Sequence, residues 1–181
     1  MTIPNILTMG RVILVPVIVW ALLAGKPMTA FALFCAAGLS DAVDGILARL
    51  LNQHSELGAW LDPIADKAML VSVFVVLGIL GFLPLWLTIL VVFRDLLIVV
   101  GVMLTFALGY QIEMKPLAVS KANTAAQIAL AGFVLGILAF ELEMPMTQQA
   151  LEILTGILTV ASAIAYITQG LVLLSDDGRT S

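Results

Sequence analysis

The chain has 181 residues, of which 62% are hydrophobic and 11% are charged, and its mean hydropathy is +1.15. This composition excludes an ordinary soluble domain and is typical of an integral membrane protein. The formal net charge is -4, and no basic patch or arm in the sequence points to a nucleic-acid partner. Since a membrane-spanning helix needs about 20 residues, the length fits about six spans, and residues 1–181 are expected to form a single membrane domain.

Six apolar segments follow one another along the chain, each long enough to cross a bilayer as a helix. Their predicted bounds are Ile6–Ala24, Met28–Leu51, Ala59–Leu80, Leu83–Leu108, Leu117–Phe140 and Gln148–Leu174. Turn-forming or helix-stopping residues separate them: Gly25-Lys26-Pro27, Gly81-Phe82, Gly109-Tyr110 and Glu143-Met144-Pro145. Apolar runs of this length exclude a membrane barrel, whose strands have about 10 residues and alternate. The predicted fold is therefore an all-α integral membrane protein with six transmembrane helices.

The basic residues predict the orientation of these helices, because cytoplasmic connections carry an excess of lysine and arginine. With the N-terminus in the cytoplasm, most basic residues fall near cytoplasmic helix ends: Arg11, Arg49, Lys67, Lys115, Lys121 and Arg179. Lys26 falls on the other side, together with Glu141 and Glu143. Six spans then return the C-terminus, so both termini are predicted to be cytoplasmic, in the inner membrane of a bacterium.

Four aspartates stand at fixed spacing in two segments that are otherwise apolar. They form the pattern Asp41-x-x-Asp44-Gly45-x-x-Ala48-Arg49 and, after eight residues, Gly58-x-x-x-Asp62-x-x-x-Asp66. An aspartate at the centre of a membrane helix costs roughly 2.5 to 3.5 kcal/mol, so four of them need cations or water beside them. The pattern therefore marks the predicted functional site.

The spacing places each half of this pattern on one helical face. Asp41 and Asp44 are three residues apart, and Asp62 and Asp66 are four apart. Because the connection between the two segments is short, both halves are expected at one end of an antiparallel helix pair. Facing carboxylates cannot all ionise without cations between them, and an all-oxygen donor set favours Mg²⁺ or Mn²⁺ over zinc. Two such ions about 4 Å apart would clamp phosphate oxygens.

All eight residues of the pattern match, position for position, the signature of the CDP-alcohol phosphatidyltransferases, and the chain resembles that family. The resemblance continues in Pro4-Asn5-x-Leu7-Thr8-x-x-Arg11 and in Asp62-Pro63-x-Ala65-Asp66-Lys67, and it covers essentially the whole chain. It implies that a phosphatidyl group is transferred from CDP-diacylglycerol to a hydroxyl acceptor, with release of CMP. It also implies a homodimer.

The resemblance further implies a role for each position of the pattern. Asp41, Asp44 and Asp62 are similar to metal ligands, and Asp66 to the general base that takes the proton of the acceptor, with a metal contact of its own. The small or basic positions resemble those that hold the CDP moiety: Gly45, Ala48, Arg49 and Gly58. The active site is expected on the cytoplasmic side.

Two acceptors are compatible with this family, phosphatidylglycerol and sn-glycerol 3-phosphate. The later segments contain Phe93-Arg94-Asp95, Ser120-Lys121-x-Asn123-Thr124-Ala125-x-Gln127 and Ala161-Ser162-Ala163-x-Ala165-Tyr166. They resemble the mitochondrial-type, CMP-forming cardiolipin synthases more than the phosphatidylglycerophosphate synthases, so phosphatidylglycerol is the expected acceptor. Its phosphate is predicted to meet Arg94, with Lys121 and Arg11 as further cations. Arg94→Ala is accordingly expected to weaken mainly the use of the acceptor.

Other interpretations of these charged residues stay open. The aspartate cluster could belong to an ion transporter, because intramembrane acids also mark ion routes. Arg94 and Asp95 could form a purely structural ion pair. Lys121 could simply lie at the hydrated start of its helix.

Overall fold

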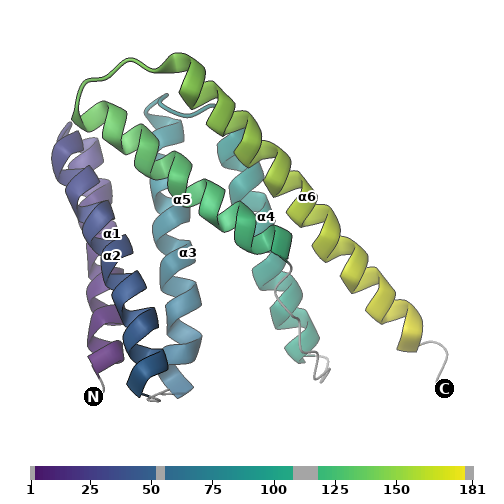
Figure 1. The fold of residues 1–181 in the computed structure, drawn as a ribbon. Coiled ribbons are helices and arrows are strands. Elements are labelled where there is room, and N and C mark those ends of the chain that lie inside the picture. The colour runs from purple at the N-terminus through teal and green to yellow at the C-terminus, as the bar shows by residue number, and fades with distance from the viewer. Residues whose placement is uncertain (1–2, 52–55, 108–117, 178–181) are drawn as a thin grey trace.

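The computed structural model describes the backbone of residues 3–51, 56–107 and 118–177, and the side chains of residues 13–40, 67–101 and 118–169. Within these ranges the chain forms α-helices and no strands (Figure 1). The helices are α1 (Ile3–Leu23), α2 (Pro27–Leu51), α3 (Glu56–Ile79), α4 (Leu85–Ala107), α5 (Ala118–Ala139) and α6 (Pro145–Asp177). All six agree with the predicted segments to within three residues at each end, so the all-α prediction is confirmed.

Three described turns end helices by the same backbone device. After α1, the N–H of Lys26 bonds to the carbonyl of Ala21 at 2.8 Å, and Gly25 takes a left-handed φ of 66°. After α3, the N–H of Phe82 bonds to the carbonyl of Leu77 at 2.9 Å, with Gly81 at φ 80°. These are Schellman motifs, in which glycine is favoured because it has no Cβ to strain. The turn signals at Gly25 and Gly81 are thereby confirmed.

The turn after α5 uses the same motif without a glycine. The N–H of Leu142 bonds to the carbonyl of Ile137 at 2.9 Å, and Glu141 occupies the left-handed position with φ 53°. The three turns lie at one end of the bundle, whereas α1 begins and α6 ends at the opposite end (Figure 1). The break predicted at Gly109-Tyr110 lies outside the described residues.

The helices pack around a core in which α1 contacts α2 and α3, α5 contacts α2 and α6, and α4 contacts α3 and α6. Large side chains from five of the helices are buried in it: Ile18, Phe34, Phe74, Leu77, Leu87, Leu130 and Leu135. Helix α1 thereby joins α2 to α3. The contacts of α4 with α6 and of α5 with α6 then place the polar residues of the second half against one another.

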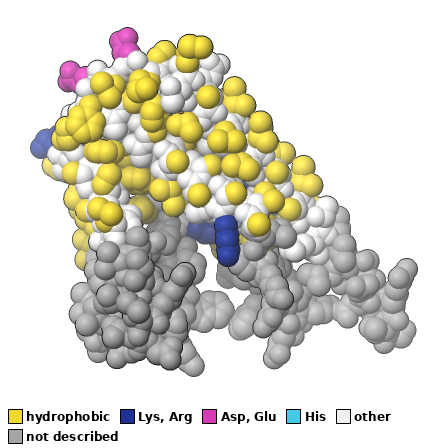
Figure 2. Space-filling model, in the orientation of Figure 1, with side chains coloured by type: hydrophobic (Ala, Val, Ile, Leu, Met, Phe, Trp, Pro, Cys, Tyr) yellow, Lys and Arg dark blue, Asp and Glu magenta, His cyan; other side chains and the backbone are white. Residues whose placement is uncertain are grey.

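The outer surface is also apolar. Hydrophobic side chains cover most of the face drawn in colour in Figure 2, and acidic side chains on that face gather at its upper edge, where the α5–α6 turn lies. Ile79 is 70% exposed and Ile157 62%. Among the described residues, Ala118–Ala139 and Pro145–Gln169 are long and apolar enough to cross a membrane. Because a soluble protein rarely exposes so large an apolar surface, these features indicate a membrane protein.

We expect Gly78→Ala to destabilise the α3–α4 packing. A Cβ at Gly78 would lie 2.5 Å from Oγ1 of Thr88 and 3.2 Å from its Cβ, and Thr88 is buried. Overpacking of this kind costs about 1 to 3 kcal/mol, which should lower the Tm of the detergent-solubilised protein. Gly38→Ala is the matched control, because a Cβ at Gly38 meets nothing within 4 Å. Adding Thr88→Ala should recover part of the loss; an unchanged Tm in Gly78→Ala would contradict the tight packing.

Candidate functional site

The two halves of the aspartate pattern lie on consecutive helices. Asp41 and Asp44 are on α2, and Asp62 and Asp66 are on α3. Only residues 52–55 connect the two helices, so the C-terminal end of α2 and the N-terminal end of α3 lie at the same end of the bundle. The helical placement is as predicted.

The side chains of the pattern lie outside the described residues, as does Arg11. Among the side chains that are described, no group of three or more histidine, cysteine, aspartate or glutamate residues could hold a metal ion. The metal site therefore stays a prediction from its donor set. Four carboxylates and no nitrogen or sulfur ligand fit Mg²⁺ or Mn²⁺, which prefer oxygen.

Directly after the pattern, Lys67 forms an ion pair with α4. Its Nζ lies 2.9 Å from Oδ1 of Asp95. The Asp95 side chain is only 6% exposed, whereas that of Lys67 is 31% exposed. Because Lys67 is the next residue after Asp66, this ion pair connects the aspartate pattern to the second half of the bundle.

Arg94 lies at the centre of a buried hydrogen-bond network. Its Nη1 donates to Oδ1 of Asp95 at 2.6 Å. Its Nη2 donates to Oγ of Ser120 at 2.6 Å and to Oγ of Ser162 at 2.6 Å, and its Nε donates to the same Ser162 oxygen at 3.1 Å. The Tyr166 ring lies 5.9 Å from the guanidinium carbon. These hydrogen bonds use four of the five N–H donors of the guanidinium and join α4, α5 and α6.

This network favours a structural contribution from the Arg94–Asp95 pair. Arg94 is 0% exposed and Asp95 is 4% exposed. Asp95 Oδ1 accepts from both Arg94 and Lys67, so these three described groups carry two positive charges and one negative charge. Asp95 consequently keeps a cationic partner even if one of the two moves away.

A ladder of polar side chains continues from this network between α5 and α6. Arg94 joins Ser120 to Ser162, and Thr159 contacts Asn123. The same register along the two helices gives Gln127 and Thr155, both buried, as the third level. Each step along α5 is matched by a step back along α6, as expected for antiparallel helices in one register. Buried polar side chains between apolar helices also hold the two helices together.

In the second level of the ladder, the hydroxyl of Thr159 lies between two oxygen atoms. Thr159 Oγ1 lies 2.7 Å from the carbonyl oxygen of Thr155 and 2.8 Å from Oδ1 of Asn123. A hydroxyl has one hydrogen to donate, and Nδ2 of Asn123 is buried without a partner in the present amide orientation. In the turned orientation, Nδ2 would donate to Thr159, whose hydroxyl would donate to the carbonyl of Thr155, and Oδ1 would take the position without a partner.

The third level differs, because Nε2 of Gln127 and Oγ1 of Thr155 are both buried without a hydrogen-bond partner. They belong to facing levels of the same register.

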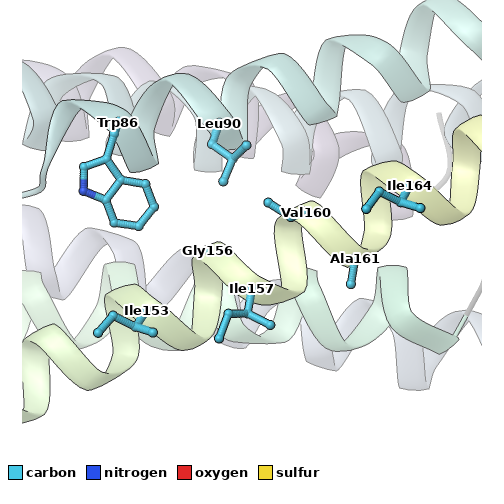
Figure 3. Close-up of a pocket in the computed structure, with 8 residues that line it drawn as sticks. All are labelled: Trp86, Leu90, Ile153, Gly156, Ile157, Val160, Ala161 and Ile164. Atoms are coloured by element: carbon cyan, nitrogen blue, oxygen red, sulfur yellow. The ribbon is translucent and has the colours of Figure 1, made fainter.

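An apolar groove of about 600 Å³ lies between α4 and α6 (Figure 3). Its lining side chains are Trp86, Leu90, Ile153, Ile157, Val160, Ala161 and Ile164, with Gly156 between them. A Cβ at Gly156 would lie 3.0 Å from the Trp86 ring, so the glycine lets α6 approach α4 closely. The groove presents no polar group for phosphate chemistry and suits hydrocarbon. The Arg94 network is the polar region of the described bundle that adjoins the aspartate pattern.

Sequence reasoning identified only part of this network. Arg94 was predicted as a cation for the acceptor phosphate, and Lys121 is exposed on α5, next to Ser120. Lys67, Ser120 and Ser162 were not predicted to meet Arg94 or Asp95. The available signal was the repeated three- and four-residue spacing of polar residues within apolar helices, at Ser120, Asn123 and Gln127 and at Thr155, Thr159 and Ser162.

Comparison with known proteins gives one family over nearly the whole chain. A family model described as CDP-alcohol phosphatidyltransferase matches residues 1–173. A probable CMP-forming cardiolipin synthase of Drosophila melanogaster is 33% identical over 183 residues, which cover 92% of this chain and 57% of that protein. The CMP-forming cardiolipin synthase of Homo sapiens is 33% identical over 188 residues, which cover 93% of this chain and 62% of that protein.

A bacterial relative is similar over a shorter stretch. A probable phosphatidylglycerophosphate synthase of Mycobacterium tuberculosis is 42% identical over 98 residues, which cover 51% of this chain and 47% of that protein. The chain spans about three-fifths of the length of the two animal relatives.

Proposed function

Because the chain belongs to the CDP-alcohol phosphatidyltransferase family, we propose that it transfers a phosphatidyl group from CDP-diacylglycerol to a hydroxyl acceptor and releases CMP. The observation that carries this proposal is the match over residues 1–173, which includes both halves of the aspartate pattern on the consecutive helices α2 and α3. The proposed donor, acceptor and product are all membrane lipids or their precursors, in agreement with the apolar surface of the bundle.

The proposed acceptor is phosphatidylglycerol, which would make the product cardiolipin. The relatives named as CMP-forming cardiolipin synthases are similar over 92% and 93% of this chain. The alternative acceptor is sn-glycerol 3-phosphate, which is favoured by the 42% identity to a probable phosphatidylglycerophosphate synthase over about half of the chain.

In the proposed reaction, the acceptor hydroxyl oxygen bonds to the phosphorus of the phosphatidyl group, and the bond from that phosphorus to the CMP oxygen breaks. Asp66 takes the hydroxyl proton as general base, and CMP leaves with the bonding electron pair. Members of this family generally use divalent metal ions. Two ions of Mg²⁺ or Mn²⁺, held by Asp41, Asp44, Asp62 and Asp66, would supply positive charge to the diphosphate.

The remaining positions of the pattern would bind the CDP moiety. Gly45, Ala48 and Gly58 leave space against the helix backbone, and Arg49 provides a cation for the phosphates. Arg94, Lys121 and Arg11 are proposed as cations for the acceptor. Arg94 would act through its charge from a fixed position, because Asp95, Ser120 and Ser162 hold its guanidinium.

We further propose that all six helices span the inner membrane of a bacterium, with both termini and the active site at the cytoplasmic side, and that the enzyme is a homodimer. Two observations support the orientation. The start of α1 and the end of α6 lie at the same end of the bundle (Figure 1). Glu141 and Glu143 lie in the turn at the other end, and the basic residues of the sequence favour the end with the termini.

A product assay tests this function. Purified protein would be incubated with CDP-diacylglycerol and Mg²⁺, with phosphatidylglycerol or sn-glycerol 3-phosphate offered separately, and the lipid product identified by mass spectrometry. We expect cardiolipin. Phosphatidylglycerophosphate without cardiolipin would change the acceptor and leave the family activity in place. Movement of Mg²⁺ or protons into liposomes, with no release of CMP, would support a transporter instead.

Removal of divalent metal should abolish the release of CMP. We expect a chelator to stop the reaction, and added Mg²⁺ or Mn²⁺ to restore it, because the four carboxylates would otherwise repel the diphosphate. Asp41→Ala and Asp62→Ala should each lose nucleotide binding, measured with CDP-diacylglycerol in detergent. Glu152→Gln is a matched carboxylate control on α6, where Glu152 accepts a hydrogen bond from Gln148 at 2.8 Å. Release of CMP that is insensitive to the chelator would contradict the metal site.

A further inference from the structure

We infer that Lys67 contacts the phosphate of the acceptor, and that Asp95 is the positioning residue that holds the Lys67 ammonium until the acceptor binds. This inference rests on the proposed function. Lys67 is the cation next to Asp66. The group that it would recognise is a phosphate joined through glycerol to the reacting hydroxyl.

Arg94 is the buried cation of the network. Its guanidinium is held by Asp95 on α4, Ser120 on α5 and Ser162 on α6, and it is 0% exposed. Rotating it toward a ligand would leave buried hydroxyls and a carboxylate without their donor, which is unfavourable in an apolar environment. Arg94 is therefore a fixed charge that stabilises the position of its neighbours.

Lys67 is the more exposed of the two cations that contact Asp95. Its side chain is 31% exposed, and its ammonium has three donors on a flexible four-carbon stem. The ion pair holds this stem in place, with Nζ of Lys67 2.9 Å from Oδ1 of Asp95. When Lys67 turns to a ligand, Asp95 keeps its 2.6 Å contact with Arg94 and is not left as an unpaired buried carboxylate. Lys67 can consequently exchange Asp95 for a phosphate at low cost.

Lys67 also lies close in sequence to the proposed catalytic base. Lys67 follows Asp66 directly on α3, and Asp66 is the proposed base for the acceptor hydroxyl. In phosphatidylglycerol, and equally in glycerol phosphate, a short glycerol chain separates that hydroxyl from the phosphate. Successive side chains on a helix diverge by about 100°, so the phosphate is reached by the length of the Lys67 stem together with the glycerol chain of the acceptor, and not by a direct approach of Lys67 to Asp66. The ion pair of Lys67 with α4 places this phosphate site between α3 and α4.

The test is a kinetic comparison with the full-length protein in detergent. Lys67→Met should raise the KM for phosphatidylglycerol about tenfold, because a charge-assisted hydrogen bond is lost. The KM for CDP-diacylglycerol should stay the same. Lys67→Arg should recover most of the acceptor affinity, because it keeps the charge. Lys26→Met is the matched control, since Lys26 lies at the other end of the bundle, 4.9 Å from the Trp20 ring, and should leave both constants unchanged.

Asp95→Asn tests the positioning role. It should also raise the acceptor KM, by less than Lys67→Met, and the double variant should be no worse than Lys67→Met alone, since both changes act on one contact. An unchanged acceptor KM in Lys67→Met would overturn the inference while cardiolipin formation by the wild type kept the proposed function. So would an equal change in both KM values together with a lower Tm, which indicates a purely structural role. No release of CMP by the wild type with either acceptor would overturn the proposed function and the inference together.

Discussion

Asp66→Asn is expected to lower the rate of CMP release by about a thousandfold, because general-base catalysis contributes typically 10² to 10⁴ in rate. Asparagine has nearly the shape of aspartate but cannot take the proton of the acceptor hydroxyl. The measurement is the steady-state release of CMP with CDP-diacylglycerol, Mg²⁺ and phosphatidylglycerol. Glu143→Gln is the matched control, since it makes the same chemical change in the turn at the opposite end of the bundle.

The same variant should still fold and should keep much of its affinity for CDP-diacylglycerol. A Tm close to that of the wild type, with slow turnover and retained donor binding, would separate loss of the base from loss of the structure. Turnover near the wild-type rate in Asp66→Asn would show that another group takes the proton.

The second large effect is expected from Arg94→Met, which removes the central donor of the buried network. Breaking a buried ion pair by removing one partner typically costs about 3 to 5 kcal/mol, and the lower value applies here because Lys67 still pairs with Asp95. Ser120 and Ser162 also lose a cationic donor at 2.6 Å each. We expect a clear fall in Tm, measured by thermal unfolding in detergent.

Two further variants define the origin of this effect. Ser162→Ala should cost only about 1 to 3 kcal/mol, since it removes one acceptor and leaves the Arg94–Asp95 contact. Arg94→Lys keeps the charge and loses the planar geometry that reaches both serines, so it should fall between the two. An Arg94→Met variant that unfolds at the wild-type temperature would contradict the structural role. Because Arg94 substitutions are expected to alter stability, acceptor binding is better tested at Lys67.

The helices were predictable from the sequence because their signals are local. Apolar runs fixed their number, and Gly25 and Gly81 marked ends where a left-handed residue is required. The end of α5 gave no such signal. Glu141 occupies the left-handed position there, in the turn that the sequence marks by Glu143-Met144-Pro145, and α6 begins at Pro145.

The aspartate pattern was predictable for the same reason, since spacings of three and four residues define one face of a single helix. The Arg94 network was not, because its partners are far apart in sequence. Lys67 and Asp95 are separated by 28 positions and Arg94 and Ser162 by 68, so their contact depends on how α3, α4, α5 and α6 pack. The sequence identified Arg94 as a residue in need of an anion and gave only Asp95 and the acceptor phosphate as candidate partners.

The polar ladder between α5 and α6 has a consequence for how the protein enters the membrane during its synthesis. Asn123 and Gln127 on α5, and Thr155 and Thr159 on α6, are fully buried in the bundle, so either helix alone would expose polar groups to lipid. Only the five residues of the turn, Phe140 to Met144, separate the two helices, so they can leave the translocation machinery together as a hairpin. Arg94 on α4 also receives a hydrogen-bond acceptor from Ser162 of this last helix. The hydrogen bonding of Arg94 is therefore complete only when the final helix has been made, and a nascent chain that stops before α6 leaves Arg94 without the Ser162 acceptor.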